Sequence, residues 1–312
     1  MNREIRVFAP ATVSNIACGF DIMGFAIDCP GDEVVLRVTD NKGVVISGIT
    51  GDDGRLTKDP SKNTAGAPLI SMIEKLNLNT GLELEIHKKM PFGSGLGSSA
   101  ASAVAAAFAL NHLLELNLSK EQLLPFAIDG EIIASGSVHA DNVAPALYGG
   151  FTLIRGYDPI DVIKLGYPKD LFCTVIHPHI EISTKVSRDM LPTSIPLRQA
   201  VKQWGNCSGL TAGLLTDDYS LIGRSLVDSI VEPVRSRLIP CFDNMKSAAV
   251  AAGALGCSIS GSGPSLFALS RGEECANKVG IEMKKAFNST GIGSDIYVST
   301  INEIGPKILY IK

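Results

Sequence analysis

The sequence lacks a long hydrophobic run and a block of like charges. Its longest nearly apolar stretch, 100–110, is shorter than the roughly 20 residues that a membrane-spanning helix needs. A net charge of −4 comes without the basic stripe of a nucleic-acid-binding protein. The first ten residues are charged and alternate like a strand, unlike a secretory signal. These absences predict a soluble cytoplasmic protein that binds neither membrane nor nucleic acid.

Cysteine provides neither a metal site nor a disulfide framework. The seven cysteines are odd in number and include no CxxC pair. Scattered cysteines of this kind are typical of reduced thiols. Charged residues make up only 19% of the chain and hydrophobic residues 45%, so the chain is not disordered and can bury a sizeable core. At 312 residues, its length favours two domains.

Hydrophobic periodicity predicts strands and helices without strict alternation, which favours two α+β domains. Strands are expected at 3–9, 33–39, 44–48, 82–87, 149–155, 171–177, 296–300 and 307–311, with a hairpin at 257–269. Helices are expected at 64–76, from the end of a glycine-rich loop to 116, and at 119–135, 197–216, 219–230, 242–254 and 274–288. The segment 156–169, rich in Gly, Pro and Asp, predicts a boundary between an N-terminal domain, 1–160, and a C-terminal domain, 161–312.

Glycine is in excess, with 31 residues in 312, and its most informative cluster lies between the strand at 82–87 and the next helix. Gly93, Gly95 and Gly97 alternate, which lets backbone N–H groups face an anion. The helix start adds its free N–H groups and the positive end of its dipole. No Asp or Glu in the first turn balances that dipole. The pattern favours a phosphate-binding loop.

Other interpretations of this loop stay open at this point. A Walker-type loop requires a lysine that is missing here. Gly95-x-Gly97-x-x-Ala100 also fits a dinucleotide fingerprint, which needs an acidic residue about 20 positions later at the end of a second strand. Glu121 has that spacing but lies in a capping box that begins a helix. A dehydrogenase and a plain strand–helix connection therefore remain alternatives.

The motif PFGSGLGSSAA at 91–101 resembles the phosphate loop, PxxxGLGSSAA, of the GHMP kinases. Segments 10–24 and 260–268 are similar to that family's N-terminal and C-terminal motifs, in the family's order and spacing. Within the family, the pattern SNxxxGFD at 14–21 and the segment 139–150 resemble homoserine kinases. Ala17-Cys18 is a departure, because homoserine kinases usually have Gly-Pro there.

This resemblance implies a fold and an activity. The fold would combine a ribosomal-protein-like N-terminal domain that holds the ATP phosphate loop with a ferredoxin-like C-terminal domain that contributes to the substrate site. The activity would be ATP- and Mg²⁺-dependent phosphorylation of the side-chain hydroxyl of L-homoserine to O-phospho-L-homoserine in threonine biosynthesis, often by a homodimer. The alternatives are a kinase for a mevalonate-type or sugar-type alcohol, and a binding protein of this fold without turnover.

The resemblance also implies nucleotide contacts. Asn63 would contact adenine. The phosphates would lie against the loop formed by Pro91, Phe92, Gly93, Ser94, Gly95, Leu96, Gly97, Ser98, Ser99, Ala100 and Ala101.

One carboxylate falls on an apolar helix face. In the helix expected from Ser119, Glu131 shares a face with Ala127 and Ile128. A buried carboxylate is costly unless it is paired or bound to metal, so Glu131 is either a structural partner or a Mg²⁺ ligand. Mg²⁺ prefers oxygen and usually takes one or two protein ligands beside phosphates and water. The resemblance implies that Ser99 and Glu131 are the metal ligands and act in catalysis.

A homoserine site needs partners for an ammonium, a carboxylate and a hydroxyl. The resemblance implies Asp21 at the ammonium with Asn15 and Asn142 nearby, and Arg188 and Arg235 at the carboxylate. It also implies Thr184 at the reacting hydroxyl and close backbone approach at Gly261, and His139 is a further candidate. The residues alone allow simpler interpretations: an Asx turn at Asp21, a solvated Arg188, a turn histidine at His139 and a loop-ordering Asp141. Lys88 and Lys89 precede the loop and either help to hold the triphosphate or form a solvated strand end, which is favoured. Because positioning and charge stabilisation can supply most of the rate of phosphoryl transfer, no general base is required.

Overall fold

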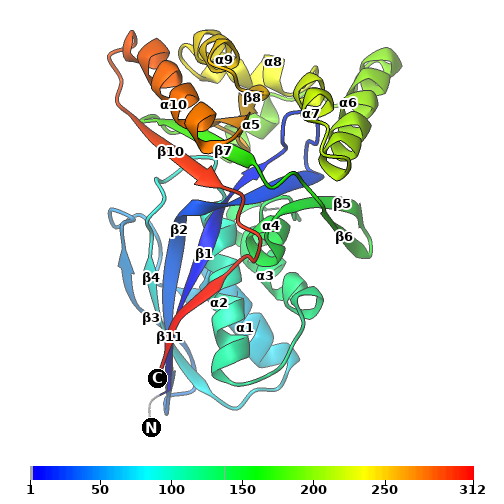
Figure 1. Ribbon diagram of the computed structural model, residues 1–312. Coiled ribbons are helices and arrows are strands. Elements are labelled where there is room, and N and C mark those ends of the chain that lie inside the picture. The colour runs from blue at the N-terminus through cyan, green and yellow to red at the C-terminus, as the bar shows by residue number, and fades with distance from the viewer. Residues whose placement is uncertain (1–2, 137) are drawn as a thin grey trace.

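A computed structural model describes residues 3–136 and 138–312 (Figure 1). The strands are β1 (Glu4–Ser14), β2 (Met23–Thr39), β3 (Gly43–Thr50), β4 (Gly81–His87), β5 (Phe151–Tyr157), β6 (Ile160–Leu165), β7 (Leu171–Pro178), β8 (Gly256–Ile259), β9 (Leu266–Arg271), β10 (Ser294–Thr300) and β11 (Lys307–Ile311). The helices are α1 (Gly66–Lys75), α2 (Ser98–Leu113), α3 (Lys120–Ser135), α4 (Val143–Tyr148), α5 (Thr184–Asp189), α6 (Leu197–Leu215), α7 (Tyr219–Ser225), α8 (Glu232–Arg235), α9 (Phe242–Ala251) and α10 (Glu273–Asn288), with 3₁₀ turns η1 (Pro60–Lys62) and η2 (Ser236–Leu238).

The first sheet has the strand order β11-β1-β2-β4-β3, and β5 pairs with both β2 and β6. Its pairs are antiparallel except for β3 and β4, which are parallel and joined through η1 and α1. The register aligns Val34 with Val7 on one side and with Ile86 on the other. All three side chains are buried. Helices α1 to α4 cover one face of this sheet (Figure 1).

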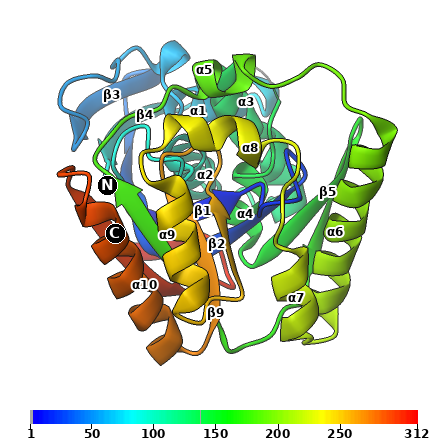
Figure 2. The same cartoon turned by 90° about the horizontal axis from the view of Figure 1, so that it is seen from above.

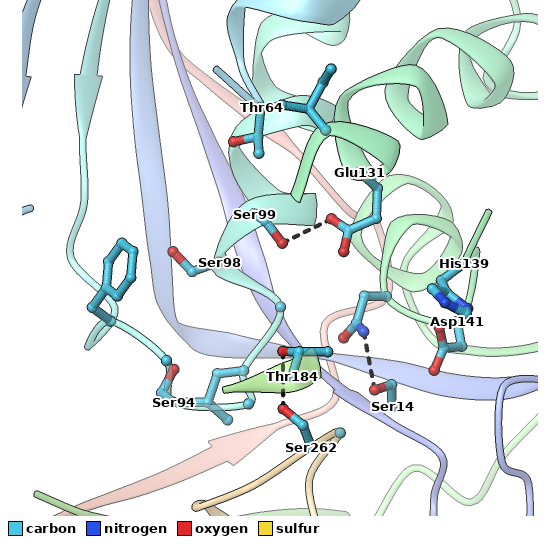
Figure 3. A pocket seen from close by; sticks show the side chains of 18 of the residues that line it. Ser14, Thr64, Ser94, Ser98, Ser99, Glu131, His139, Asp141, Thr184 and Ser262 are labelled. Carbon is cyan, nitrogen blue, oxygen red and sulfur yellow. Dashed lines mark hydrogen bonds between the residues drawn. The ribbon is translucent and has the colours of Figure 1, made fainter. Parts of the chain in front are cut away.

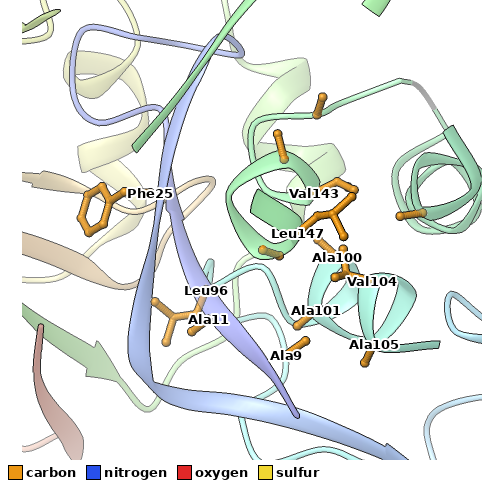
Figure 4. Close-up of a cluster of buried hydrophobic side chains, with 14 of the residues drawn as sticks. Ala9, Ala11, Phe25, Leu96, Ala100, Ala101, Val104, Ala105, Val143 and Leu147 are labelled. Carbon is orange, nitrogen blue, oxygen red and sulfur yellow. The ribbon is translucent and has the colours of Figure 1, made fainter. Parts of the chain in front are cut away.

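Helix α2 is the centre of the first lobe. It is apolar on nearly every side, as expected of a buried helix. Its many alanines allow close approach by neighbours: Ala101 lies near Ala9 of β1, and Ala100 and Val104 face α4 (Figure 4). Packing on both sides fixes the N-terminus of α2, where the glycine-rich loop ends.

Helix α3 begins with the expected capping box. The Ser119 N–H donates to Gln122 Oε1 at 2.9 Å, and the Gln122 N–H donates to Ser119 Oγ at 3.4 Å. Gly130 allows close packing on α2, since a Cβ there would lie 2.8 Å from Cβ of Ala103. Glu131 is thereby brought beside the start of α2.

The second sheet is antiparallel with the order β10-β7-β9-β8. The expected hairpin at 257–269 is confirmed as β8 and β9, and the loop between them is the second glycine cluster. In Figure 2, α9 and α10 lie at one side of the molecule and α6 and α7 at the other. The mixture of two sheets and their covering helices confirms the α+β class. Within the described residues, no helix combines the length and hydropathy of a membrane span.

The boundary after residue 160 stays a prediction. Residue 160 begins β6, which pairs with β5, and β11 returns from the end of the chain to pair with β1. Some elements differ from expectation. The helix expected to reach 230 ends at Ser225. The Asp228 carboxylate accepts the N–H groups of residues 230–232, so these groups bond to a side chain and do not continue the helix. The short helices α4, α5 and α8 have too little periodicity to be recognised.

Candidate active site

A cavity of about 510 Å³ lies where loops from both sheets meet (Figure 3). Its walls bring together most of the predicted site residues: Asn15, Asp21, Asn63, Phe92 to Ser99, Glu131, His139, Asn142, Thr184, Arg188, Arg235 and Gly261. Pro91, Ala100 and Ala101 do not line it. The two predicted ends of the site, for nucleotide and for substrate, therefore share one cavity.

The glycine-rich loop has the expected backbone. Gly93, Gly95 and Gly97 have φ of 63°, 76° and 68°, in the left-handed region that favours glycine. Gly97 is the N-cap of α2, with no side-chain cap and no acid in the first turn. The N–H groups of the first helical turn are consequently available to an anion.

Of the last two motif residues, Ala101 has its N–H group occupied, and the phosphate contact of Ala100 stays a prediction. The Ala101 N–H donates to Gly97 O at 2.9 Å, so it closes the first helical turn and is not available to a phosphate. The side chains of Ala100 and Ala101 are buried in the core (Figure 4). They support the loop by packing, because only small side chains fit between α2 and its neighbours.

A buried ion pair, missed from the sequence, anchors both ends of the loop. Asp32 accepts the N–H groups of Lys89 at 2.8 Å and Met90 at 3.1 Å, and the hydroxyl of Ser98 at 2.6 Å. Its carboxylate also pairs with Lys88, whose ammonium donates to Ser98 O at 2.8 Å. The expectation of a solvated Lys88 was wrong, because the lysine is buried. In the sequence, Asp32 follows Pro-Gly and resembles an ordinary turn residue.

The glycine-rich loop is also joined to the loop between β8 and β9. Ser260 Oγ donates to Gly95 O at 2.7 Å. A Cβ on Gly95 would lie only 2.5 Å from Ser260 O, so no side chain fits there. The two glycine clusters of the sequence therefore form one contact, which closes the cavity from the side of the second sheet.

Ser99 and Glu131 point toward one another from α2 and α3 (Figure 3). Ser99 Oγ donates to Glu131 Oε2 at 2.8 Å. Burial raises the pKa of Glu131 to about 7, although the hydrogen bond from Ser99 opposes the shift. Two oxygen donors beside a phosphate-type loop match the ligand set that Mg²⁺ prefers. The buried position of Glu131 agrees with its predicted place on the apolar face.

At the other end, Asp21 and Arg188 form a two-pronged ion pair. Arg188 Nη1 and Nη2 donate to the two carboxylate oxygens at 3.0 and 2.8 Å, and this hydrogen bonding raises the pKa of Arg188. The interpretation of Arg188 as a solvated charge was wrong. The guanidinium groups of Arg188 and Arg235 each lie 5.3 Å from the ring of Phe20.

Arg235 is buried at the junction of the two sheets. Its Nη1 donates to Gly261 O at 2.8 Å, and burial, with the nearby charge of Arg188, lowers its pKa to about 10. It is still cationic at neutral pH. Asn15 Nδ2 donates to the same carbonyl at 3.0 Å and Asn15 Oδ1 accepts the Asp21 N–H at 3.1 Å. Gly261 thus connects the loop at 15–22 to the C-terminal loop.

The segment before α4 adds three polar residues. Asn142 Nδ2 donates to Ser14 Oγ at 3.0 Å, and Asn142 Oδ1 accepts from Thr12 Oγ1 at 2.8 Å. Asp141, expected only to order its loop, lines the cavity, and burial together with the charge of Asp21 raises its pKa to about 7. His139 Nδ1 lies 3.9 Å from Asp21 Oδ1, and burial lowers the pKa of the imidazole.

Two further predicted residues line the cavity. Thr184 Oγ1 is 3.3 Å from Ser262 Oγ, which joins α5 to the C-terminal loop (Figure 3). Asn63 Nδ2 donates to Thr57 O at 2.8 Å and Asn63 Oδ1 accepts the Ala65 N–H at 3.0 Å. The amide of Asn63 therefore orders the cavity wall, and its contact with adenine stays a prediction.

The comparisons with known proteins agree with this geometry. Residues 64–150 match the family model of the GHMP kinases N terminal domain, and residues 210–289 match that of the GHMP kinases C terminal domain. A homoserine kinase of Chlorobium phaeobacteroides is 50% identical over 98% of this chain and all of that protein. The chain belongs to the homoserine kinase family of the GHMP kinases. A homoserine kinase of Arabidopsis thaliana is 42% identical over 98% of this chain and 85% of its own length.

Solved structures give the same family and a wider fold relationship. The crystal structure of homoserine kinase from Cytophaga hutchinsonii is 61% identical, with a TM-score of 0.96 over 98% of this chain and 97% of that chain. The mevalonate kinase of L. major has a TM-score of 0.72 at 18% identity, over 94% and 95% of the two chains, and shows the shared fold alone. The family's two-domain α+β fold is thus confirmed. As members of this family are kinases, ATP is the phosphate donor and the acceptor is a small molecule.

Proposed function

We propose that the protein transfers the γ-phosphoryl group of ATP to the side-chain hydroxyl of L-homoserine, forming ADP and O-phospho-L-homoserine in threonine biosynthesis. One observation carries the proposal: a single cavity joins the phosphate loop and its Ser99–Glu131 pair to two arginines and two carboxylates. A sugar offers no charge to such residues. Mevalonate carries a carboxylate but no ammonium, and the acids at 21 and 141 favour a substrate that has both.

At the nucleotide end, the chain's own groups hold the phosphates. The N–H groups of the left-handed glycines and of the first turn of α2 would bind phosphate oxygens, and the buried Asp32–Lys88 pair keeps the loop in place. A pre-formed loop reduces the conformational entropy that is lost when ATP binds. Asn63 would contribute to the wall against adenine.

The residues present fit a magnesium ion. Ser99 Oγ and the Glu131 carboxylate would hold it. When bound, Mg²⁺ would neutralise charge on the phosphate oxygens. Ionised Glu131 serves this role, and a nearby cation would lower its pKa from the raised value that burial produces.

At the substrate end, Arg235 would bind the carboxylate of homoserine, since it is buried and cationic and lies beside Gly261. Arg188 would contribute charge to the same group while holding Asp21 in place. The substrate ammonium would lie between Asp21 and Asp141 and relieve the repulsion that raises the pKa of Asp141. Asn15 and His139 would complete this end of the cavity.

For the transfer step, orientation and charge are the main contributions that this site offers. Thr184 would orient the substrate hydroxyl toward the γ-phosphate, Asn142 would lie near the substrate ammonium, and the loop around Gly261 would exclude water. Phosphoryl transfer through a loose transition state gains most from such positioning. No side chain needs to act as a general base in this proposal.

An ADP-release assay tests the proposal. The purified protein is supplied with Mg·ATP and, separately, with L-homoserine, mevalonate or galactose. We expect ADP release with homoserine only, and O-phospho-L-homoserine as the product by mass spectrometry. Absence of homoserine-dependent ADP, or a faster reaction with either other alcohol, would reject homoserine as the substrate.

We also propose a cytoplasmic location and a homodimer. The location is supported by seven free cysteines, which suit a reducing compartment. The dimer is supported by the family resemblance alone. Light scattering after gel filtration tests it, and a mass near 33 kDa would contradict it, since the chain weighs 32.9 kDa.

A further inference from the structure

A second cavity, of about 380 Å³, lies behind the loop that carries part of the substrate site. It is formed by Cys18, Phe20 and Ile22 of that loop, the segment 191–195, α6 and the residues just before α8. Its walls are mainly apolar and include Phe20 and Trp204. Two thiols, Cys18 and Cys207, line the same cavity.

The two thiols come from elements that are already joined at this point. Cys18 lies on the loop between Asn15 and Asp21, and Cys207 lies on α6. One turn before Cys207, Gln203 Nε2 donates to Cys18 O at 3.0 Å, which holds the loop against the helix. Cys18 Sγ donates to Ile16 O at 3.8 Å and Cys207 Sγ donates to Met23 Sδ at 3.6 Å, and each thiol shifts the pKa of the other. Figure 1 shows the loop between β1 and β2 on the side of the molecule where α6 lies.

We propose that Cys207 and Cys18 form a peroxide-sensitive oxidation site that closes reversibly to a disulfide. The Cys207 thiolate attacks a hydroperoxide, so that an S–O bond forms, the O–O bond breaks and Cys207 becomes a sulfenic acid. The Cys18 sulfur then attacks the Cys207 sulfur, the S–O bond breaks and water leaves with the Cys18 proton. In total, two thiols and one hydrogen peroxide give one disulfide and two waters, and a dithiol reductant reverses the reaction.

The order of the two steps follows from the surroundings of each thiol. Cys207 is half-buried on the cavity wall, whereas Cys18 is only 3% exposed. The interaction with Cys18 lowers the pKa of Cys207, and the interaction with Cys207 together with burial raises the pKa of Cys18. A more acidic, accessible thiol beside a resolving partner is the arrangement of redox-sensing cysteines.

The other buried thiols are poor competitors for the oxidant. Cys173 and Cys257 lie in the core, where burial raises the pKa of both. Cys29 is exposed on β2 and provides a control for unspecific oxidation.

The disulfide would affect one end of the active site. Asn15 and Asp21 flank Cys18 on the same loop, so a covalent bond to α6 restricts the residues that we assign to homoserine. The nucleotide contacts lie on other elements. This consequence rests on the proposed function: oxidation is expected to raise the KM for homoserine several-fold and to leave the KM for ATP nearly unchanged, with recovery after reduction.

Disulfide mapping tests the site without relying on activity. The full-length protein is treated with hydrogen peroxide, its free thiols are blocked, and a non-reducing digest is analysed by mass spectrometry. We expect a peptide pair linked through Cys18 and Cys207 and a loss of two of the seven titratable thiols, both reversed by dithiothreitol. The link is expected in Cys29→Ser and absent in Cys207→Ser. Absence of the link in the wild-type protein, or a link between other cysteines, would overturn the proposal.

Kinetics with the same samples test the consequence. Cys207→Ser is expected to keep its homoserine KM after peroxide treatment, whereas the wild-type KM rises. Equal inactivation of both proteins would place the sensitive thiol elsewhere, and a fully linked enzyme with an unchanged homoserine KM would contradict the effect on the substrate loop. If homoserine is not phosphorylated at all, the proposed function fails while the mapped disulfide still decides the redox site.

Discussion

At the scale of single residues, Glu131 is the side chain on which turnover depends most in this site. It lies beside Ser99 and the phosphate loop, and Gln keeps its volume while removing the charge. We expect Glu131→Gln to lower kcat by roughly 100-fold or more, as loss of a key charge-stabilising group does. The thermal midpoint is expected to stay the same or rise, because a buried carboxylate is lost.

Asp129→Asn is the matched control for this substitution. Asp129 is on the same helix but bonds outward to Ser71 Oγ at 2.5 Å and to Lys75 at 2.9 Å. Its substitution is expected to change stability slightly and kcat hardly at all. Wild-type kcat in Glu131→Gln, or an equal loss in both variants, would contradict the role given to Glu131.

Asp141 predicts a pH dependence of stability in the ligand-free protein. Its pKa is about 7 in the folded state and starts from an ordinary value of 3.8, so the folded protein binds the proton more tightly than the unfolded chain. Between these two pKa values the free energy of unfolding therefore falls as pH rises. Asp141→Asn lacks this titration and is expected to gain stability relative to wild type between about pH 4 and pH 8. Thermal unfolding of both proteins across this pH range measures the difference in stability between them. A difference that does not change with pH would contradict the raised pKa of Asp141.

At the scale of elements, the contact between the two glycine clusters leaves no space for a side chain at position 95. Gly95 has a φ of 76° and no space for a Cβ, whereas Gly54 has a φ of 72° with no atom within 4 Å of a built Cβ. Alanine strains the backbone at both positions, but only Gly95→Ala must displace the Ser260 loop. We expect kcat/KM for ATP to fall roughly 100-fold in Gly95→Ala, as misplacement of a catalytic loop does.

Gly54→Ala separates the effect of backbone strain from the effect of displacing the Ser260 loop. This variant should lose only the stability that the left-handed strain costs, less than Gly95→Ala loses, and keep its kcat/KM for ATP. Steady-state kinetics and thermal unfolding of the two variants make the comparison. Similar kinetics for both would show that the loop contact does not matter for nucleotide use.

At the scale of the whole molecule, one core cluster crosses from the first sheet into the second, and a second cluster lies between the second sheet and helices α9 and α10. The cluster around β1, β2 and α2 continues into Cys173, Val175 and Phe267 of the second sheet. Phe25 and Phe267 pack edge to face with ring centres 5.9 Å apart, and Ile27 pairs with Ile301. We expect a single calorimetric unfolding transition, whose midpoint rises with ATP or with homoserine alone. Two resolved transitions that respond separately to the two ligands would contradict this shared core.

The sequence predicts those features that depend on residues close together in the chain. The phosphate loop depends on glycines close together in the chain, and the position of Glu131 follows from helical periodicity. The Asp32–Lys88 pair, the Asp21–Arg188 pair and the return of β11 to β1 join residues far apart, and no local pattern encodes them. The place of Asp141 in the cavity is not predictable from the sequence for a similar reason. Its raised pKa arises from burial beside Asp21, which only the folded chain brings about.

The single tryptophan of the chain has an optical consequence. Trp204 lies on α6 between Gln203 and Cys207, on the wall of the second cavity, and is 60% exposed. Its fluorescence therefore comes from one known place, next to the loop that carries Asn15 and Asp21. Emission intensity and quenching by acrylamide should follow movement of that loop in real time, in the unlabelled protein, without background from any other indole.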